Sequence, residues 1–177
     1  MAKLEQGLIQ VYTGDSKGKT TAAIGLAVRA VGHGFKVFII QFMKGQDYYG
    51  ELKALKRLEP DCQIEHYGGK GWVYMGNPST EDLREAAKAM ARAKEIISSG
   101  QWDIVILDEI FNAIWFELVK EDEVLKLLES KPPHVELVLT GRNATDAIKA
   151  KADLVTDMIM IKHPYEQGIA GRKGIEF

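Results

Sequence analysis

Residues 14–21 read Gly14-Asp15-Ser16-Lys17-Gly18-Lys19-Thr20-Thr21, and this stretch decides the fold. The preceding run, residues 8–12, has the apolar and β-branched content of a buried strand. The following run, residues 21–31, places apolar side chains on one helical face, and Gly32 ends it. A strand, a glycine-containing loop and a helix in this order predict a phosphate-binding loop.

The chemistry of this loop suits a nucleoside triphosphate. Glycine lets backbone N–H groups turn toward phosphate oxygens, the helix N-terminus adds a positive dipole, and Lys19 adds a full charge. The hydroxyl of Thr20 is placed to bind Mg²⁺. The strict motif requires glycine where Thr13 stands, with Gly14 one position later. The alternative is a glycine turn with an exposed lysine, but the strand-to-helix junction favours the nucleotide loop.

The composition is that of a globular protein of one domain, which we expect to span residues 1–177. Its 23 Lys and Arg residues nearly balance its 25 Asp and Glu residues, so the charge favours neither nucleic acid nor an anionic membrane as partner. The single cysteine, Cys62, is interpreted as a buried thiol at the start of a strand. Residues 1–6 carry no signal-peptide core, and no run reaches membrane-spanning length, so we expect a cytoplasmic protein.

Strand-like runs alternate with helix-like runs along the whole chain. The predicted strands after the loop are residues 35–42, 63–67, 102–107, 135–139 and 154–161, and the predicted helices are residues 50–58, 80–99, 111–119, 121–128 and 144–152. This alternation predicts an α/β fold, a three-layer P-loop nucleotide-binding fold with a mainly parallel central sheet. The run at 63–67 alternates with polar residues, which places it nearer an edge. Right-handed crossovers bring the loops after the strands to one edge, where ligands bind.

Polar residues follow two of the predicted strands at this edge. Asp108 and Glu109 come directly after the apolar strand at 102–107. A carboxylate there, downstream of a phosphate loop, is the usual second half of a Mg²⁺–nucleotide site. The alternative is a solvated pair at a helix N-cap. Arg142 follows the strand at 135–139 and is a candidate clamp for phosphate or substrate, or else an ion-pair partner at a helix start.

Segment 67–78 differs from a core strand because several glycines stand among large aromatic residues. It is interpreted as a surface loop that presents Trp72 and Tyr74 to a flat or apolar ligand. The alternative is that both rings fold back as a lid over the core. The glycine-rich segment 162–174 has neither helical nor strand periodicity and is interpreted as a terminus of partial mobility.

A phosphate loop indicates that a nucleotide is bound but not which of its bonds breaks. Three classes remain open: a phosphoryl-transfer enzyme, a switch or motor ATPase, and an enzyme that attacks the nucleotide elsewhere. A switch or motor usually brings further domains or long insertions, which these 177 residues lack. A kinase needs a base beside its acceptor, and Glu109 could supply one.

Several motifs together resemble those of one family. They are Tyr12-Thr13-Gly14-Asp15-Ser16-Lys17-Gly18-Lys19-Thr20-Thr21-Ala22-Ala23, Gln41-Phe42-Met43-Lys44-Gly45, Val105-Ile106-Leu107-Asp108-Glu109, Thr140-Gly141-Arg142, Lys162-His163-Pro164-Tyr165-Glu166-Gln167-Gly168 and Gly174-Ile175. In this order they resemble the bacterial ATP:corrinoid adenosyltransferases of the cobalamin-salvage type, over nearly the whole chain. The variant phosphate loop of that family has the same shortened glycine spacing.

The resemblance implies a transferase in which the cobalt(I) of a corrinoid attacks the 5′ carbon of ATP and triphosphate leaves. ATP and a reduced corrinoid would be the substrates and Mg²⁺ the cofactor. The resemblance implies catalytic roles for Lys19, Thr20 and Glu109, a metal site of Thr20, Asp108 and Glu109, and corrinoid contacts from Trp72 and Tyr74. The nucleotide contacts that it implies are Gly14, Asp15, Ser16, Lys17, Gly18, Lys19, Thr20, Thr21, Arg29 and Arg142.

The resemblance also bears on the cobalt and on partners. Apolar rings against the cobalt face would favour the four-coordinate state, and Trp72 and Tyr74 stand where we expect Phe and Trp. His163 is rejected as a cobalt ligand, because a strong axial ligand would oppose that state. A homodimer and an external electron donor, a reduced flavin or flavoprotein, are further implied. The alternatives are a small-molecule kinase that transfers the γ-phosphoryl group of ATP, and a nucleotide-dependent protein that delivers the corrinoid without making a bond.

Overall fold

The computed structural model describes residues 4–177, which are built around one six-stranded sheet. The strand order is β3-β2-β4-β5-β1-β6, and neighbouring strands pair in parallel. The strands are β1 (Ile9–Thr13), β2 (Val37–Gln41), β3 (Cys62–His66), β4 (Ile104–Asp108), β5 (Glu136–Thr140) and β6 (Leu154–Asp157). The prediction of a mainly parallel sheet is confirmed.

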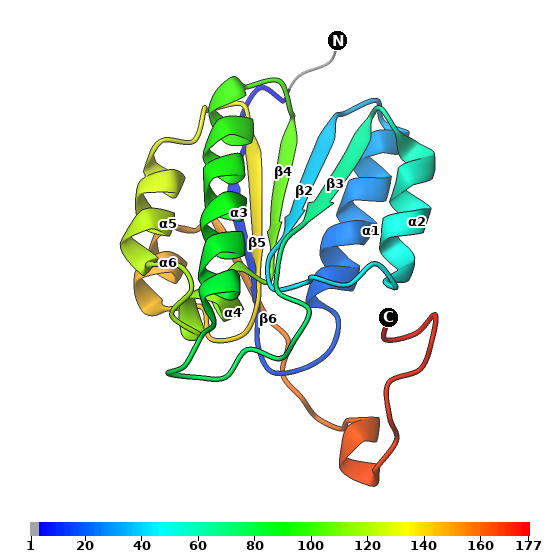
Figure 1. Ribbon diagram of the computed structural model, residues 1–177. Helices are drawn as coiled ribbons and strands as arrows, with labels where there is room; N and C mark the ends of the chain where they lie inside the picture. The colour runs from blue at the N-terminus through cyan, green and yellow to red at the C-terminus, as the bar shows by residue number, and fades with distance from the viewer. Residues whose placement is uncertain (1–3) are drawn as a thin grey trace.

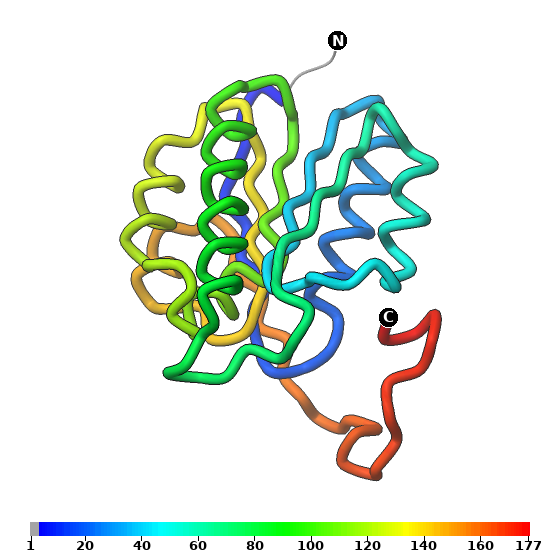
Figure 2. The backbone as a smooth tube through the Cα atoms, in the orientation of Figure 1, coloured from blue at the N-terminus to red at the C-terminus, as the bar shows by residue number. Residues whose placement is uncertain are grey.

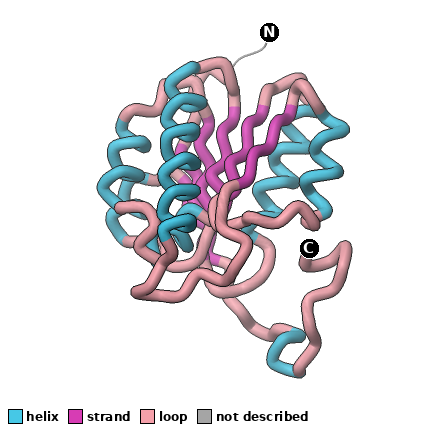
Figure 3. Tube along the Cα trace, in the orientation of Figure 1, coloured by secondary structure: helices cyan, strands magenta, loops and turns pink. Residues whose placement is uncertain are grey.

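Helices cover both faces of the sheet and give the predicted three layers (Figure 1). One face packs against α1 (Lys19–Gly32) and α2 (Gly50–Leu55), which continues into a 3₁₀ turn at Lys56–Leu58. The other face packs against α3 (Thr80–Ser99), α4 (Ile110–Trp115), α5 (Glu121–Glu129) and α6 (Asp146–Lys151). Figure 3 shows the strands as a central layer between these two groups of helices. The predicted three-layer α/β fold is therefore confirmed.

The central strands supply most of the core. Every residue of β2, β4 and β5 is buried, as expected for a parallel sheet that is covered on both faces. Ala23, Ala27 and Ala30 form the buried stripe of α1, and their small size lets this helix lie close to the sheet. This packing fixes the carboxyl ends of the strands, from which the polar side chains project. Within residues 4–177, no helix is both long and apolar enough to cross a bilayer.

The long helix α3 begins and ends where its sequence predicts. The hydroxyl of Ser79 accepts a hydrogen bond from the backbone N–H of Asp82, whose carboxylate accepts one from the backbone N–H of Ser79. This reciprocal pair is a capping box. Gly100 follows the last turn with a φ of 58°, in the left-handed conformation. The capping box fixes the point at which segment 67–78 enters α3.

The strand predicted at residues 154–161 is shorter in the structure, since β6 ends at Asp157. Its neighbour β1 ends opposite, at Thr13, because the chain turns into the phosphate loop at Gly14 with a φ of 100°. Among the described residues, no strand therefore pairs with the segment after Asp157. At the other edge lies β3, as its alternating pattern predicted, and Cys62 at its start is buried. Burial raises the pKa of the Cys62 thiol to about 11.

The last part of the chain, residues 158–177, leaves the sheet and returns below α1 and α2 (Figure 2). It contains a 3₁₀ turn at Pro164–Gln167. The ammonium of Lys17 donates a hydrogen bond to the carbonyl of Ile175, with an Nζ–O distance of 2.9 Å. This end of the described chain therefore lies against the phosphate loop.

Candidate nucleotide-binding site

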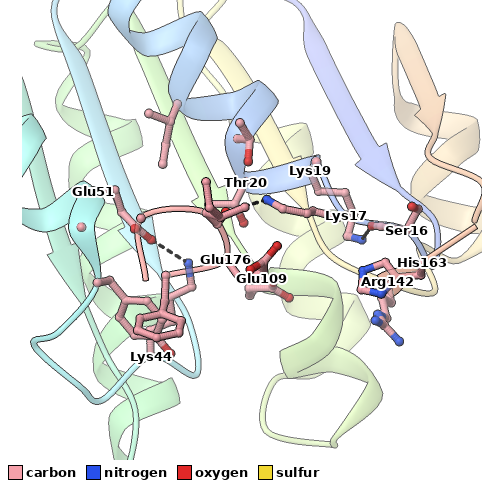
Figure 4. A pocket seen from close by; sticks show the side chains of 18 residues that line it. Ser16, Lys17, Lys19, Thr20, Lys44, Glu51, Glu109, Arg142, His163 and Glu176 are labelled. Carbon is pink, nitrogen blue, oxygen red and sulfur yellow. Dashed lines mark hydrogen bonds and ion pairs between the residues drawn. The ribbon is translucent and has the colours of Figure 1, made fainter. Parts of the chain in front are cut away.

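A cavity of about 470 Å³ opens at the carboxyl edge of the sheet, beside the phosphate loop. This volume is within the usual range for small-molecule sites. Charged side chains from several elements gather around the cavity (Figure 4). The lining includes residues 16–21, Lys44, Glu51, Glu109, Arg142 and residues 174–177. The sheet thus brings together most of the site residues that the sequence predicted, which lie far apart along the chain.

Lys19 is buried within the phosphate loop. Its Nζ donates hydrogen bonds to the backbone carbonyls of Gly14 and Ser16, both at 2.7 Å. Burial lowers the pKa of Lys19, and the charge of Glu109 acts in the opposite direction. The two carbonyls hold the ammonium where the oxygens of a bound triphosphate would accept its hydrogen bonds.

Asp108, at the tip of β4, is fully buried and joins several elements. Its Oδ1 accepts hydrogen bonds from the hydroxyls of Thr20, at 2.8 Å, and Thr140, at 2.7 Å. Its Oδ2 accepts from Gln41 Nε2 and Lys44 Nζ, both at 3.0 Å. Both oxygens are therefore occupied by protein donors. Asp108 thus holds in place the hydroxyl of Thr20, the threonine that the sequence predicted to lie at the same metal site.

The Asp108–Lys44 pair is a buried ion pair. Burial by itself would raise the pKa of Asp108, but the charge of Lys44 and the hydrogen bonds from Thr140 and Thr20 outweigh it and hold the pKa below its usual value. Burial by itself would lower the pKa of Lys44, but Asp108 and Glu51 outweigh it and raise that pKa. The Nζ of Lys44 also lies 3.2 Å from Glu51 Oε1. Both members of the pair are therefore ionised at neutral pH.

Replacing Lys44 with methionine should lower the free energy of unfolding by about 3–5 kcal/mol at pH 7, since it leaves the buried Asp108 carboxylate without its cation. The pKa of Asp108 is depressed in the folded state, so the pair stabilises the fold above the unfolded-state value of about 3.9 and loses this effect as the pH falls through the folded-state value. The difference in the free energy of unfolding between wild type and Lys44→Met should therefore shrink in acid.

Urea unfolding at pH 7 and at pH 3 measures this difference and its dependence on pH. The double variant Lys44→Met/Asp108→Asn is the control and should recover much of the loss; a cost below about 1 kcal/mol for Lys44→Met would contradict the account.

Glu109 follows Asp108 in a left-handed conformation, with a φ of 62°. It stands at the N-cap position of α4, but its side chain makes no capping hydrogen bond, so the N-cap alternative is not supported. Its carboxylate lines the cavity, and among the described residues its buried Oε2 has no hydrogen-bond partner. Burial, and then the charge of Asp108, raise the pKa of Glu109. A buried carboxylate oxygen with no protein donor fits a bound cation.

The two predicted arginines differ in position. Arg142 lines the cavity, and within residues 4–177 no carboxylate lies at ion-pair distance from its guanidinium. The candidate clamp is therefore favoured over the ion pair at a helix start. Arg29 is exposed on α1, about 15 Å along the helix axis from Lys19, and it does not line this cavity. Gly14 and Asp15 line a second cavity, together with Asn143 and Asp157.

Trp72 and Tyr74 are presented to solvent, with exposed fractions of 88% and 69%. The alternative in which both rings fold back on the core is therefore wrong. The base of their loop is anchored, because the backbone N–H of Lys44 donates to the carbonyl of Tyr67 at 2.9 Å. A Cβ added at Gly45 would lie 2.3 Å from the carbonyl oxygens of Gly68 and Gly69. The segment that carries Lys44 and the aromatic loop therefore interlock at a place where only glycine fits.

Sequence reasoning assigned no role to several residues of the cavity. Lys44 and Glu51 form the ion pairs beside Asp108, and Tyr49 and Phe177 add aromatic side chains to the lining. One signal for Lys44 was its position just after β2, at the carboxyl edge. Phe177 had none, because it reaches the cavity only through the path of the last twenty residues. His163 also lines the cavity, and its Nδ1 accepts a hydrogen bond from the backbone of Tyr165.

The phosphate loop lies between β1 and α1 of a parallel sheet, and its Thr20 contacts Asp108 at the tip of β4 on the same edge. This arrangement defines a P-loop nucleotide-binding protein. Residues 5–177 match the model of a family described as "ATP:corrinoid adenosyltransferase BtuR/CobO/CobP". The chain therefore belongs to the ATP:corrinoid adenosyltransferase family, and the resemblance seen in the sequence is confirmed.

Curated relatives agree with this membership. A corrinoid adenosyltransferase of a Sinorhizobium species is 39% identical over 98% of this chain and 81% of its own length. The corrinoid adenosyltransferase of Pseudomonas aeruginosa is 34% identical over 99% of this chain and 86% of its own. That of Escherichia coli strain K12 is 32% identical over 99% and 88%. The chain is thus a transferase of this family, and the kinase alternative is not favoured.

Proposed function

We propose that the protein transfers the 5′-deoxyadenosyl group of ATP to the cobalt(I) of a corrinoid. A cobalt–carbon bond forms at C5′, the C5′–O bond breaks with its electron pair passing to the departing triphosphate, and cobalt(I) becomes cobalt(III). The observation that carries the proposal is the buried ammonium of Lys19, held at the centre of the phosphate loop. It is the group that a triphosphate leaving group requires there.

The residues of the loop act by electrostatics on the leaving group. As the C5′–O bond breaks, negative charge develops on the triphosphate oxygen that was bonded to carbon. Lys19, the backbone amides at the start of α1 and Arg142 stabilise this charge from positions that are set before the reaction begins. The reaction needs no proton transfer, so Glu109 is assigned to binding a cation and not to acting as a general base.

The residues that would hold Mg²⁺ are Glu109 and Thr20, with Asp108 behind them. Glu109 offers its buried oxygen to the cavity, and Asp108 holds the hydroxyl of Thr20 on the same side. When bound, Mg²⁺ would neutralise charge on the triphosphate. A magnesium ion in a nucleotide site is usually held by one or two carboxylates together with phosphate oxygens and water.

We assign the corrinoid to the side of the cavity that carries the aromatic loop. Trp72 and Tyr74 are exposed large rings on a loop that is anchored to the Lys44 segment. Two large exposed rings on one loop offer a surface that a flat apolar ligand such as a corrinoid can cover. Rings against the cobalt face would exclude axial ligands and so favour the four-coordinate cobalt(I) state.

Replacing Trp72 with alanine should slow adenosyl transfer by about 10–100-fold, because burying one large apolar side chain in a complex stabilises it by about 1.5–3 kcal/mol. The affinity for ATP should change little, since Trp72 does not line the nucleotide cavity. Transfer rates at saturating ATP, together with direct ATP binding, measure the two effects. Trp72→Phe is the matched control and should keep most of the rate. An unchanged rate in Trp72→Ala would remove the ring from the corrinoid site.

The assembly and the surroundings of the enzyme belong to the same proposal. We assign it to the cytoplasm as a single-domain chain that works as a homodimer. An external donor, a reduced flavin or flavoprotein, supplies the electrons that make cobalt(I). Sedimentation of the purified protein measures the oligomeric state, and a monomer at micromolar concentration would contradict the dimer.

Product analysis tests the proposed reaction. The purified protein is mixed with Mg²⁺-ATP and chemically reduced cobalamin, and the corrinoid spectrum and the released phosphates are followed together. The proposal expects a protein-dependent alkylcobalt spectrum with one triphosphate released for each corrinoid converted. ADP without a change in the corrinoid spectrum would instead indicate phosphoryl transfer or hydrolysis.

A further inference from the structure

The edge strand β6 is the most exposed strand of the sheet. All four residues of Leu154–Asp157 are exposed, whereas every residue of β2, β4 and β5 is buried. A parallel sheet is normally covered on both faces. On one side β6 pairs with β1, and on the other side no described strand pairs with it. The sheet therefore ends in a row of backbone N–H and C=O groups that no strand within residues 4–177 satisfies.

The strand at the opposite edge, β3, is covered by the protein itself. Cys62 is buried, and the rest of β3 is half-buried. Leu55 of α2 and Leu58 of the following 3₁₀ turn pack in the same apolar cluster as Ile64 of β3. Proteins that leave an edge strand open often place lysine or proline on it. Residues 154–161 contain neither, so the sequence does not protect β6 in this way.

Large apolar side chains continue from β6 into the segment that follows it. Leu154 and Met160 are 41% exposed, Val155 is 43% exposed, and Ile159 and Ile161 are 71% and 95% exposed. Since they lie within eight residues of chain, they span at most about 25 Å. At about 200 Å² for a fully exposed residue of this size, the five expose on the order of 500–600 Å², against the roughly 800 Å² that each partner buries in a stable interface. This edge therefore carries most of the surface that a dimer needs.

Two copies of one edge strand complement each other. A twofold axis perpendicular to the sheet makes the two strands antiparallel, and antiparallel strands exchange N–H···O=C hydrogen bonds along their facing edges. The same axis keeps every side chain on its own face of the sheet. Val155, in the middle of β6, then lies beside Val155 of the second copy. Valine suits such a cross-strand pair, because β-branched side chains pack well on a pleated surface.

We propose that β6 is the surface through which two copies of this chain associate, with their β6 strands antiparallel and their two sheets joined into one. The inference rests on the proposed function in taking the protein as a homodimer, and it adds the interface. Ile159 and Ile161, just beyond the strand, extend the apolar contact. The interface lies next to the nucleotide site, because Asp157 and Ile159 line the second cavity together with Gly14 of the phosphate loop.

Opposite charges at one position test the pairing. Sedimentation velocity without ligands measures the dimer dissociation constant of the wild type, of Val155→Glu, of Val155→Lys and of an equal mixture of these two variants. Each variant alone should weaken the dimer about 100-fold or more, because like charges meet across the axis. The mixture should regain much of the affinity, since a glutamate then faces a lysine. Val28→Glu is the matched control and should leave the dimer unchanged, because Val28 is a half-exposed valine on α1, away from β6.

A second variant and a second measurement guard against effects on the fold. Ile161→Glu changes a side chain that is almost fully exposed, and it should weaken the dimer as well. Circular dichroism at the same concentrations checks that each variant is folded. In the wild type, hydrogen exchange of the backbone of residues 154–157 should quicken on dilution below the dissociation constant, because the outer edge of β6 then loses its partner. Exchange in α1 should not change.

Several results would overturn this interface. A wild-type dimer that no β6 variant weakens would mean that the copies associate elsewhere, and loss of the dimer in Val28→Glu alone would point to α1. Weak dimers in both Val155 variants that the mixture does not restore would exclude the antiparallel β6 pair. A wild-type monomer would overturn the homodimer too and leave β6 to a different partner. Because neither ATP nor a corrinoid is present, these results are separate from failure of the proposed reaction, which the product analysis detects.

Discussion

Replacing Lys19 with alanine is expected to slow adenosyl transfer by about 10²–10³-fold, which is the effect of removing one preset charge-stabilising donor. The Nζ of Lys19 is the buried cation at the centre of the loop, held by the carbonyls of Gly14 and Ser16. Its charge acts on the leaving triphosphate throughout the reaction, so both the affinity for triphosphate and the rate should fall. Calorimetry with triphosphate and transfer rates at saturating ATP measure the two effects.

The control for Lys19→Ala is Lys94→Ala, which removes an exposed lysine from α3 and should change neither quantity. Melting curves without ligand check that the loop remains folded, since the alanine variant also loses two internal hydrogen bonds. Full triphosphate affinity in a folded Lys19→Ala protein would mean that Lys19 does not bind the triphosphate, and would remove the central support for the proposed reaction.

Replacing Glu109 with glutamine is expected to lower transfer by about 10²-fold at limiting Mg²⁺, with part of the rate recovered when Mg²⁺ is raised. The wild-type carboxylate offers to the cavity a buried oxygen that has no donor among residues 4–177. Glutamine keeps the shape of the side chain and removes the charge. Transfer rates titrated with Mg²⁺ measure this effect.

Glu109 also predicts a pH dependence of stability. Its pKa is raised in the folded state, chiefly by burial, so the folded protein binds more protons than the unfolded one between the unfolded-state pKa of about 4.3 and the folded-state value. Without metal, the contribution of Glu109 to the free energy of unfolding of the wild type should be fully present below about pH 4.3. It should decline as the pH rises through the folded-state pKa of Glu109. Glu109→Gln should lack this decline. Added Mg²⁺ should oppose the decline in the wild type, because the cation binds the ionised carboxylate.

The control for Glu109→Gln is Glu117→Gln. Glu117 is also a glutamate in the left-handed region, with a φ of 60°, but it is exposed. The substitution there should leave both the Mg²⁺ titration and the pH profile unchanged. Identical Mg²⁺ titrations for wild type and Glu109→Gln would exclude Glu109 from the metal site.

The local pattern was enough to predict much of the fold. The runs of apolar residues gave the strands and their order along the chain, since a fully buried parallel strand reads as a continuous apolar segment, as β4 does. Ser79 and Gly100 marked the ends of α3 because capping depends on residues only a few positions apart. The strand at 154–161 was predicted too long, because its end is set by where β1 ends and not by its own residues.

The candidate site, too, could be predicted from the sequence only in part. The phosphate loop and the acidic pair after β4 could be recognised from the sequence, because each is a short motif whose chemistry lies in adjacent residues. The sequence could not distinguish the role of Asp108 from that of Glu109. In the structure, both carboxylate oxygens of Asp108 accept hydrogen bonds from protein donors, whereas Glu109 has a buried oxygen that finds no donor in the described part of the chain.

The sequence by itself thus determined the class of fold, the place of the phosphate loop between β1 and α1, and the family, because periodicity and short motifs depend on neighbouring residues. Only the tertiary structure decided that Lys44 neutralises Asp108 and that Trp72 faces solvent. It alone also showed that Phe177 lines the same cavity as Ser16 of the phosphate loop. These are contacts between residues far apart in the chain, and they depend on the order of strands in the sheet and on the path of the last segment, neither of which any local pattern specifies.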